Sequence, residues 1–159
     1  MQITIVAVGK IKEKFMMQAI GEYKKRLGRY CKLNIIEIAD EKAPENLGVK
    51  QREQLKETEG QKILPFLKDK LYVIALDIQG EPSSSEGLAE KIRQLGLRGD
   101  SNLVFVIGGS LGLSAEIINK ADFRLSLSPL TFPHQLTRLI LLEQIYRSFK
   151  IIKNEPYHK

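Results

Sequence analysis

The feature that most constrains this chain is a strand-forming run that ends in a glycine turn and leads straight into a helix signal. Leu103–Ile107 is apolar and β-forming, Gly108 and Gly109 follow it, and Gly112 comes three residues later. Ser114 then stands at a helix N-cap position. The order strand, glycine turn, helix is typical of open α/β sheets, which bind ligands beyond the carboxyl ends of their strands. We therefore predict a small-molecule site here.

Two more specific interpretations of this turn are excluded by its spacing. The order Gly-Gly-x-x-Gly is not the Gly-x-Gly-x-x-Gly of dinucleotide-binding turns, and no Lys-Ser or Lys-Thr follows to make a phosphate loop. Glycine lets a backbone approach a ligand closely, but it also serves simply to turn a corner. The pattern alone leaves both explanations open.

The rest of the chain alternates strand and helix signals. We predict strands over 3–8, 33–38, 71–78, 103–107 and 123–127, and helices over 12–30, 49–64, 84–94, 115–120 and 133–153. Gly80-Glu81-Pro82 is predicted to break the chain after the third strand, and Ser83 with Glu86 has capping-box spacing. The pattern indicates one α/β domain over 1–159, a mostly parallel sheet with helices on both faces. It leaves the strand order open.

Composition narrows the class of protein. The chain has 159 residues, of which 43% are hydrophobic and 28% charged, as in an ordinary globular domain. No apolar run approaches the roughly 20 residues that span a bilayer. The single cysteine, Cys31, excludes an internal disulfide and indicates a reducing, cytoplasmic location. We expect Cys31 to be a small, partly buried residue at a helix end, and two histidines with one cysteine argue against a zinc site.

The net charge of +6 favours a polyanionic partner, RNA or DNA before others. Basic residues gather near the two ends of the chain, at Lys10, Lys12, Lys14, Lys24, Lys25, Arg26, Arg29 and Lys32, and at Arg138, Arg147, Lys150, Lys153 and Lys159. Each run alone is explained by a solvated helix face. Two such runs in a basic chain shift the interpretation toward nucleic acid.

The last predicted helix is apolar around most of its circumference. Its apolar residues are Leu136, Leu139, Ile140, Leu141, Leu142, Ile145, Phe149, Ile151 and Ile152. A helix that covers one sheet needs a single apolar stripe, so we predict a second cover from another subunit, a homodimer through this helix. Within it, Glu143 and Arg147 have i, i+4 spacing, which is read either as an ion pair or as Arg147 at the edge of a pocket.

Several stretches together resemble a known family. They are Leu71–Ile78, Val-Ile-Gly-Gly-Ser at 106–110, Leu-Ser-Leu-Ser-Pro-Leu-Thr-Phe-Pro-His-Gln at 125–135, and Asn-Glu-Pro-Tyr-His-Lys at 154–159. With the start, Ile-Val-Ala-Val-Gly-Lys, they resemble the RlmH family of SPOUT-class methyltransferases. Members methylate a pseudouridine in large-subunit ribosomal RNA with S-adenosylmethionine. The resemblance implies a C-terminal trefoil knot and a homodimer.

The resemblance also assigns roles to residues of this chain. It implies that the S-adenosylmethionine pocket is formed by Leu76, Gly108, Gly109, Leu127, Ser128, Pro129, Leu130, Thr131 and Phe132. It places the tail at an active site, that of the partner subunit. There His158 and Tyr157 are the candidates to assist removal of the N3 proton: His158 could accept it, and Tyr157 could stack on the base or hydrogen-bond to it, and the sequence leaves open which of His158, Tyr157 and Arg147 acts. Arg147 and Lys159 would hold phosphate or an anionic base edge. No metal is required.

Without the resemblance, these residues have plainer interpretations. Leu76 alone is read as core, Ser126 and Ser128 as turn chemistry, and a terminal Tyr-His-Lys as a frayed end. His134, next to Pro133, is read as structural. The rival function is a non-catalytic, basic, RNA-binding dimer associated with ribosomes. An enzyme that uses another nucleotide cofactor is disfavoured, because no acidic residue follows a dinucleotide turn to hold the ribose. With little room for an RNA-recognition domain, we expect the assembled ribosome as substrate.

Overall fold

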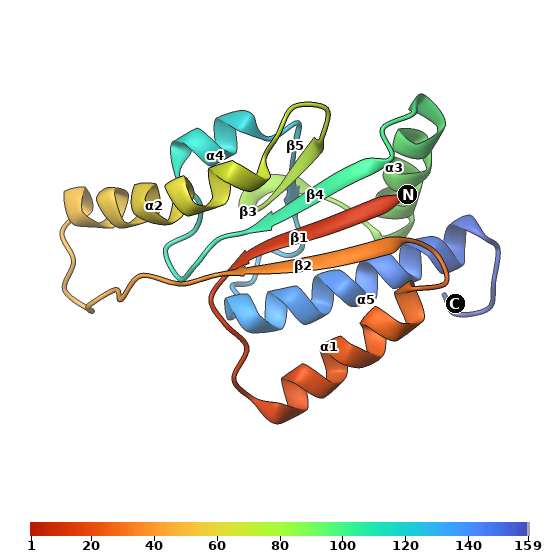
Figure 1. Ribbon diagram of the computed structural model, residues 1–159, viewed down its shortest axis with the longest axis horizontal. Coiled ribbons are helices and arrows are strands. Elements are labelled where there is room, and N and C mark those ends of the chain that lie inside the picture. The colour runs from red at the N-terminus through yellow and green to blue at the C-terminus, as the bar shows by residue number, and fades with distance from the viewer. Residues whose placement is uncertain (159) are drawn as a thin grey trace.

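A computed structural model, which describes residues 1–158, contains one sheet of five parallel strands. The strands are β1 (Gln2–Val8), β2 (Lys32–Ile38), β3 (Tyr72–Pro82), β4 (Asn102–Ile107) and β5 (Phe123–Ser126). Their order in the sheet is β2-β1-β4-β3-β5 (Figure 1). The helices are α1 (Lys14–Leu27), α2 (Val49–Ile63), the 3-10 turn η1 (Leu64–Phe66), α3 (Ser85–Arg98), α4 (Ala115–Lys120) and α5 (His134–Ile152). The predicted α/β class with a parallel sheet is confirmed.

Helices cover both faces of the sheet, as the alternation of strands and helices predicts. Alternate side chains of β1 point to opposite faces, so Ile3 and Ile5 enter one hydrophobic cluster while Val6 and Val8 enter another. Residues of α1, α3 and α5 complete the first cluster, and residues of α2 and α4 complete the second (Figure 1). A buried Val, Leu or Ile side chain stabilises the fold by about 1.5–3 kcal/mol, so both layers contribute to stability.

The sheet departs from the sequence prediction at β3. Gly80-Glu81-Pro82 does not end the strand, which continues to Pro82 after a register shift: Leu125 of β5 pairs with both Leu76 and Glu81. Gly80 permits this because a Cβ there would lie 2.6 Å from the carbonyl oxygen of Arg124. The displaced segment 77–79 is left at the carboxyl edge of the sheet.

The start of α3 also differs in detail. The N-cap is Ser84 and not Ser83, and its Oγ accepts a hydrogen bond of 3.0 Å from the backbone N–H of Gly87. The capping chemistry that the serine run predicts is therefore present, one residue further along the chain. The helix extends to Arg98, four residues beyond its predicted end.

The apolar circumference of α5 is covered largely by the chain itself. The helix packs between α1 and α3 on one face of the sheet, and no residue from 135 to 152 is fully exposed. Leu142 and Ile145 have no exposed surface and belong to the chain's own core. The burial of these two residues therefore needs no second subunit. The homodimer itself stays a prediction, as does the trefoil knot.

Cys31 is a core residue at the end of α1. It is 8% exposed, and burial raises the pKa of its thiol to about 11. It is therefore a buried thiol with little thiolate at neutral pH, as predicted for a structural cysteine. In residues 1–158, no helix is both long and apolar enough to cross a bilayer.

Candidate active site

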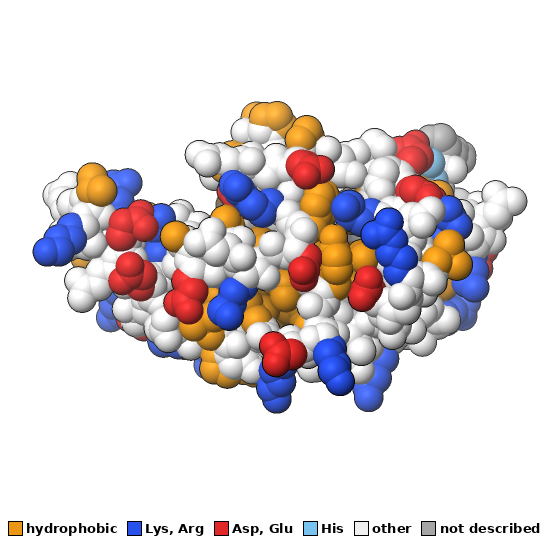
Figure 2. All heavy atoms as spheres, turned by 90° about the horizontal axis from the view of Figure 1, so that it is seen from above, with side chains coloured by type: hydrophobic (Ala, Val, Ile, Leu, Met, Phe, Trp, Pro, Cys, Tyr) orange, Lys and Arg blue, Asp and Glu red, His pale blue; other side chains and the backbone are white. Residues whose placement is uncertain are grey.

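A cavity of about 1070 Å³ opens at the carboxyl ends of β3, β4 and β5. All of the predicted cofactor residues except Pro129 line it, namely Leu76, Gly108, Gly109, Leu127, Ser128, Leu130, Thr131 and Phe132. Its size and its mainly apolar and backbone lining suit a nucleoside-sized ligand. Figure 2, which views the molecule from above, shows hydrophobic side chains in the middle of a face where acidic and basic side chains are interspersed.

The glycine turn between β4 and α4 forms one wall of this cavity. A Cβ at Gly108 would lie 2.7 Å from the carbonyl carbon of Gly112, and Gly112 has a φ of +86°. The backbone N–H of Gly112 donates a hydrogen bond of 3.1 Å to the carbonyl of Gly109. Glycine at 108 is thus required first by the close approach of the two arms of the turn, and not only by room for a ligand. Ser114 caps α4, as predicted, by accepting from the N–H of Ile117.

The irregular loop between β5 and α5 forms a second wall. Ser128 Oγ accepts a hydrogen bond of 3.0 Å from the backbone N–H of Leu130, and Ser126 Oγ donates one of 3.4 Å to the carbonyl of Ser128. The serines therefore shape the loop, as turn chemistry predicts. Leu130 lines the cavity with 70% of its surface exposed, so an apolar side chain is available to a ligand there.

An ion pair that the sequence analysis missed stands in a third wall. Arg124 of β5 donates to Asp77 Oδ2 from Nη2 at 2.6 Å and from Nε at 3.0 Å. Asp77 Oδ1 accepts from the backbone N–H of Gln79. The pair fixes the displaced segment of β3 against β5. No local pattern indicates it, because the two residues are far apart in the chain and meet only through strand pairing.

The start of α5 is anchored to the end of β1 by a buried arginine. Arg138 is 1% exposed, donates a 2.8 Å hydrogen bond to the carbonyl of Gly9, and pairs with Glu37 at 2.5 Å. Arg138 therefore cannot contact RNA, and its place among the basic residues of a nucleic-acid surface was wrong. The pattern misled because a basic residue on an amphipathic helix is usually solvated.

His134 lies against the same glycine and lines the cavity. Gly9 has a φ of +92°, and a Cβ there would lie 2.5 Å from His134 Nε2. Burial lowers the pKa of His134, Arg138 acts in the same direction, and Asp40 opposes both. The imidazole is therefore held toward its neutral form. The contact with Gly9 supports the structural interpretation of this histidine.

The three predicted catalytic residues meet in one group of side chains, here called the tail cluster: Glu86, Glu143, Arg147, Tyr157 and His158. Arg147 pairs with Glu143 through Nη2 at 2.7 Å and Nε at 3.0 Å. Tyr157 donates to Glu143 Oε1 at 3.1 Å. His158 lies 3.2 Å from Arg147 through Nδ1 and 2.7 Å from Glu86 through Nε2. The tail is thus bound to α5 and α3, and the interpretation of Tyr157 and His158 as a frayed end is wrong.

The hydrogen-bond partners within the tail cluster determine which of its atoms carry a hydrogen. Because arginine has only donors, Nδ1 of His158 accepts from Arg147, and Nε2 carries the hydrogen that is donated to Glu86. The backbone N–H of Glu86 and the hydrogen bond from His158 lower the pKa of Glu86 to about 2. Burial, followed by Tyr23 and Glu143, raises the pKa of Tyr157. Tyr157 is therefore a donor at neutral pH, and Nδ1 of His158 is occupied by Arg147 while this contact is in place. Lys159 lies outside the described residues.

The tail cluster and the cavity are separate in one chain. Within residues 1–158, the cavity lining contains none of Arg147, Tyr157 and His158, and its last residue on α5 is Thr137. Arg147 lies about 15 Å further along the helix. A smaller cavity of about 290 Å³ lies between them and shares Leu125 and Leu127 with the larger one. The cavity that suits a cofactor thus lacks the predicted catalytic residues of its own chain.

Comparison with known proteins identifies close relatives. A family described as "Predicted SPOUT methyltransferase" matches residues 1–158. Proteins named ribosomal RNA large subunit methyltransferase H from Alkaliphilus oremlandii (strain OhILAs) and Clostridium novyi (strain NT) are each 60% identical over 159 residues, the whole of both chains. Among solved structures, a probable methylase family protein from Haemophilus influenzae Rd KW20 matches with a TM-score of 0.57 at 13% identity. That match covers 99% of this chain and 70% of the other, and it concerns the fold.

Proposed function

We infer that this chain, which belongs to the SPOUT methyltransferase family and is similar over its full length to proteins named ribosomal RNA large subunit methyltransferase H, methylates N3 of a pseudouridine in 23S ribosomal RNA with S-adenosylmethionine as donor. The observation that carries the inference is the convergence of the glycine turn, Leu76 and the 127–132 loop on one cavity. Charge alone, which is all that a non-catalytic RNA-binding dimer requires, explains no such cavity.

The residues present fit the proposed donor. Apolar side chains from Leu76, Leu127 and Leu130 offer surfaces for an adenine ring, and the backbone of the turn and loop offers N–H and C=O groups to its edge. A Cβ at Gly108 would meet the backbone of Gly112 at 2.7 Å, and one at Gly109 would meet the Glu59 carboxyl at 2.8 Å, so the two glycines keep the turn in the shape that lines the cavity. When bound, S-adenosylmethionine supplies a methyl group on a positively charged sulfur.

The work of the protein is then alignment and removal of one proton. A bond forms between N3 and the methyl carbon, the carbon–sulfur bond breaks, and the N3 proton leaves. Holding the two reactants in line can supply as much as about 7–11 kcal/mol of the barrier. His158 is the proposed proton acceptor, Arg147 faces the negative charge that develops on the base, and Tyr157 donates a hydrogen bond to it. The raised pKa of Tyr157 supports its role as donor and not as base.

The separation of cavity and tail supports a homodimer in which each tail completes the partner's site. In one chain, His158 is engaged with Glu86 and Arg147, and neither of these residues lines the cavity. A two-fold dimer through the outer face of α5 brings the second half of one helix toward the first half of the other. Leu136, Leu139 and Ile140 are the half-buried apolar residues available for that face.

The assembled ribosome is the proposed substrate, with free ribosomal RNA as the alternative. The experiment that tests the function is mass spectrometry of 23S ribosomal RNA from cells that lack the protein, with and without a plasmid-borne copy. We expect one methyl to disappear from a pseudouridine and to return with the copy. Purified protein is expected to bind S-adenosylmethionine in a calorimeter. Unchanged ribosomal RNA, or no binding, would contradict the proposal and favour the non-catalytic RNA-binding dimer.

A further inference from the structure

A buried carboxyl lies directly behind the wall of the cavity. Glu59, on the second half of α2, is 3% exposed, although most of the helix around it is solvated. Its Oε1 accepts a 3.0 Å hydrogen bond from the backbone N–H of Glu41, and its Oε2 has no hydrogen-bond partner among residues 1–158. A buried polar atom without a partner is costly, so this one needs an explanation.

The carboxyl faces the glycine turn. A Cβ at Gly109 would lie 2.8 Å from Glu59 Oε2 and 3.1 Å from Oε1, so the two oxygens lie against the bare Cα of that glycine. Gly60, the residue after Glu59, makes a similarly close contact: a Cβ at Gly60 would lie 2.5 Å from the Oγ of Ser114, the N-cap of α4. Two successive residues of α2 thus pack against both ends of the segment 109–114 that lines the cavity.

The surroundings of Glu59 favour its uncharged form. Burial is the largest cause that raises its pKa, and the negative charges of Asp40 and Glu41 raise it further. The Glu41 N–H and the positive charge of Lys62 act in the opposite direction. Lys62 is itself paired with Glu41. The turn residues 108–113 carry no charged side chain, so no counter-charge comes from the side that Glu59 faces.

We propose that Glu59 is a positioning residue, whose carboxyl holds the Gly108–Gly112 turn in the conformation that binds the methyl donor. The inference rests on the proposed function for the identity of the ligand, but not for the contact. Glu59 does not line the cavity and does not touch the ligand; it acts through Gly109. As an uncharged acid it packs against Gly109 at a lower desolvation cost than a carboxylate.

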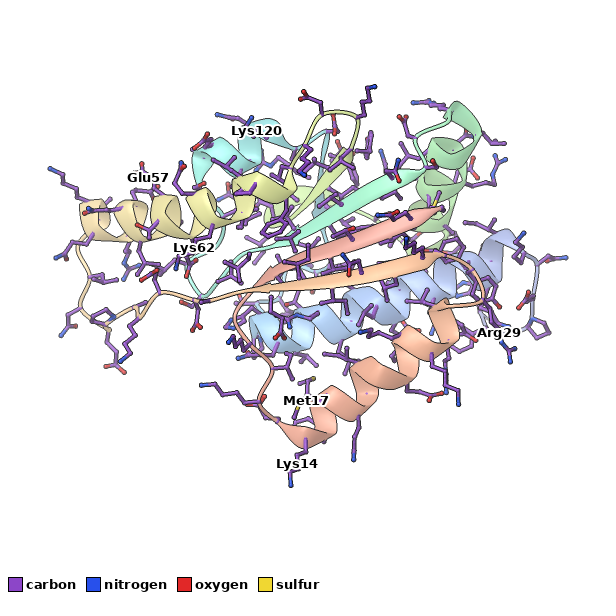
Figure 3. The ribbon with its side chains drawn as sticks, in the orientation of Figure 1. Lys14, Met17, Arg29, Glu57, Lys62 and Lys120 are labelled. Carbon is purple, nitrogen blue, oxygen red and sulfur yellow. The ribbon has the colours of Figure 1, made fainter. Side chains whose placement is uncertain are left out.

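Three variants separate this role from a structural one. Glu59→Gln keeps the shape without a charge, so donor affinity is expected to stay within about twofold of wild type. Glu59→Ala leaves a void behind Gly109 and is expected to weaken S-adenosylmethionine binding by about tenfold. Glu57→Ala, on the exposed side of the same helix (Figure 3), is the matched control and should change nothing.

The pH profile gives a readout that packing alone would not move. Because the pKa of Glu59 is raised, the uncharged carboxyl stabilises the turn fully below the ordinary pKa of glutamate. This stabilisation is lost as pH rises through the raised pKa. As pH rises through that raised pKa, wild-type affinity should therefore weaken relative to that of Glu59→Gln, whose amide does not titrate. Parallel profiles of the two proteins would overturn the proposal.

Hydrogen exchange in the free protein tests the contact without any ligand. The peptide that covers 108–113 should exchange faster in Glu59→Ala and at the wild-type rate in Glu59→Gln and Glu57→Ala. Folded Glu59→Ala with wild-type exchange there overturns the inference. If wild type does not bind S-adenosylmethionine but the exchange pattern holds, the proposed donor fails and the positioning role stands.

Discussion

The cavity and the tail cluster differ in the chemical groups that form them. The cavity is walled mainly by backbone turns and apolar side chains, with the Asp77–Arg124 ion pair in one wall, while the tail cluster consists of carboxylates, a guanidinium, a phenol and an imidazole joined by side-chain hydrogen bonds. The first can enclose a ligand, but His134 is the one histidine in its lining among residues 1–158. The second can move a proton but encloses no space of comparable size. The cavity lacks the tail cluster's groups for proton transfer, and the tail cluster lacks a comparable ligand cavity. Methyl transfer therefore requires that the two regions meet.

The two regions also differ in how rigidly the fold holds them. The glycine turn is fixed by the close backbone approach at Gly108 and by the positive φ of Gly112. The tail is held by Tyr157, which packs edge-on against Tyr146 at 5.0 Å and carries Arg147 over its ring at 4.7 Å, and by the exposed contact between His158 and Glu86. Exposed pairs contribute little to stability. The tail is therefore the part that is able to change partners.

The largest effect is expected from removal of the tail. Deletion of residues 157–159 should reduce methyl transfer by about 10²–10⁴-fold, the contribution of acid–base catalysis. It should leave the affinity for S-adenosylmethionine unchanged, because the cavity contains no tail residue among those described. Transfer is measured with tritiated donor and affinity by calorimetry, with Lys153→Ala as a nearby exposed control. Undiminished methylation would show that the tail has no part in the reaction.

The complementary change acts on the cavity alone. Gly108→Ala places a Cβ 2.7 Å from the backbone of Gly112, and overpacking of that kind should weaken donor binding by about 10–100-fold. Gly21→Ala is the matched control. No described atom other than its own helix backbone lies within 4 Å of a Cβ at Gly21, and the change removes a helix-interior glycine, so it should stabilise the fold. A Gly108→Ala protein with wild-type affinity would contradict the assignment of the turn.

A third prediction concerns the surface that joins the two regions. Leu139→Glu, on the half-buried face of α5, should weaken dimerisation by at least about tenfold while the chain stays folded. Leu142→Glu buries a charge in the core of one chain and should unfold it instead. Light scattering over a dilution series and thermal melts distinguish the two. A Leu139→Glu dimer as tight as wild type would exclude this face of the helix.

The smallest effect is expected where the tail is held in its own chain. Glu86→Ala removes the acceptor of the His158 Nε2 hydrogen bond and should raise methyl transfer by less than about fivefold. Glu90→Ala, one turn further along α3 and paired with Arg93, is the control. A fall in rate after Glu86→Ala would mean that this contact assists the reaction and does not compete with it.

The parts of the site that sequence could predict are those marked by local chemistry. The strand before Gly108 and the cap at Ser114 each carry a signal within a few residues, and both were placed correctly. The Glu143–Arg147 pair was readable from helical spacing in the same way. The 127–132 loop and the tail were found only through the family resemblance.

The parts that could not be predicted depend on distant residues. Glu59 looks like one more solvated acid on a polar helix until α2 packs against the turn. Arg138 looks like a surface base until Gly9 and Glu37 meet it from two strand ends. Gly80 looks like a strand breaker until β5 pairs beside it. In each case the local sequence pattern predicted the more common structural role of the residue, and a tertiary contact gives it a different role.

The cavity of one chain is proposed to work with the tail of another, and co-expression of two impaired variants, assayed with too little donor to saturate Gly108→Ala, tests this pairing. Gly108→Ala supplies an intact tail, and the 157–159 deletion supplies an intact cavity. Random pairing makes half of the dimers mixed, each with one complete site, so the account predicts about a quarter of wild-type methyl transfer. No activity in the mixture, with dimers formed and both chains folded, would contradict it.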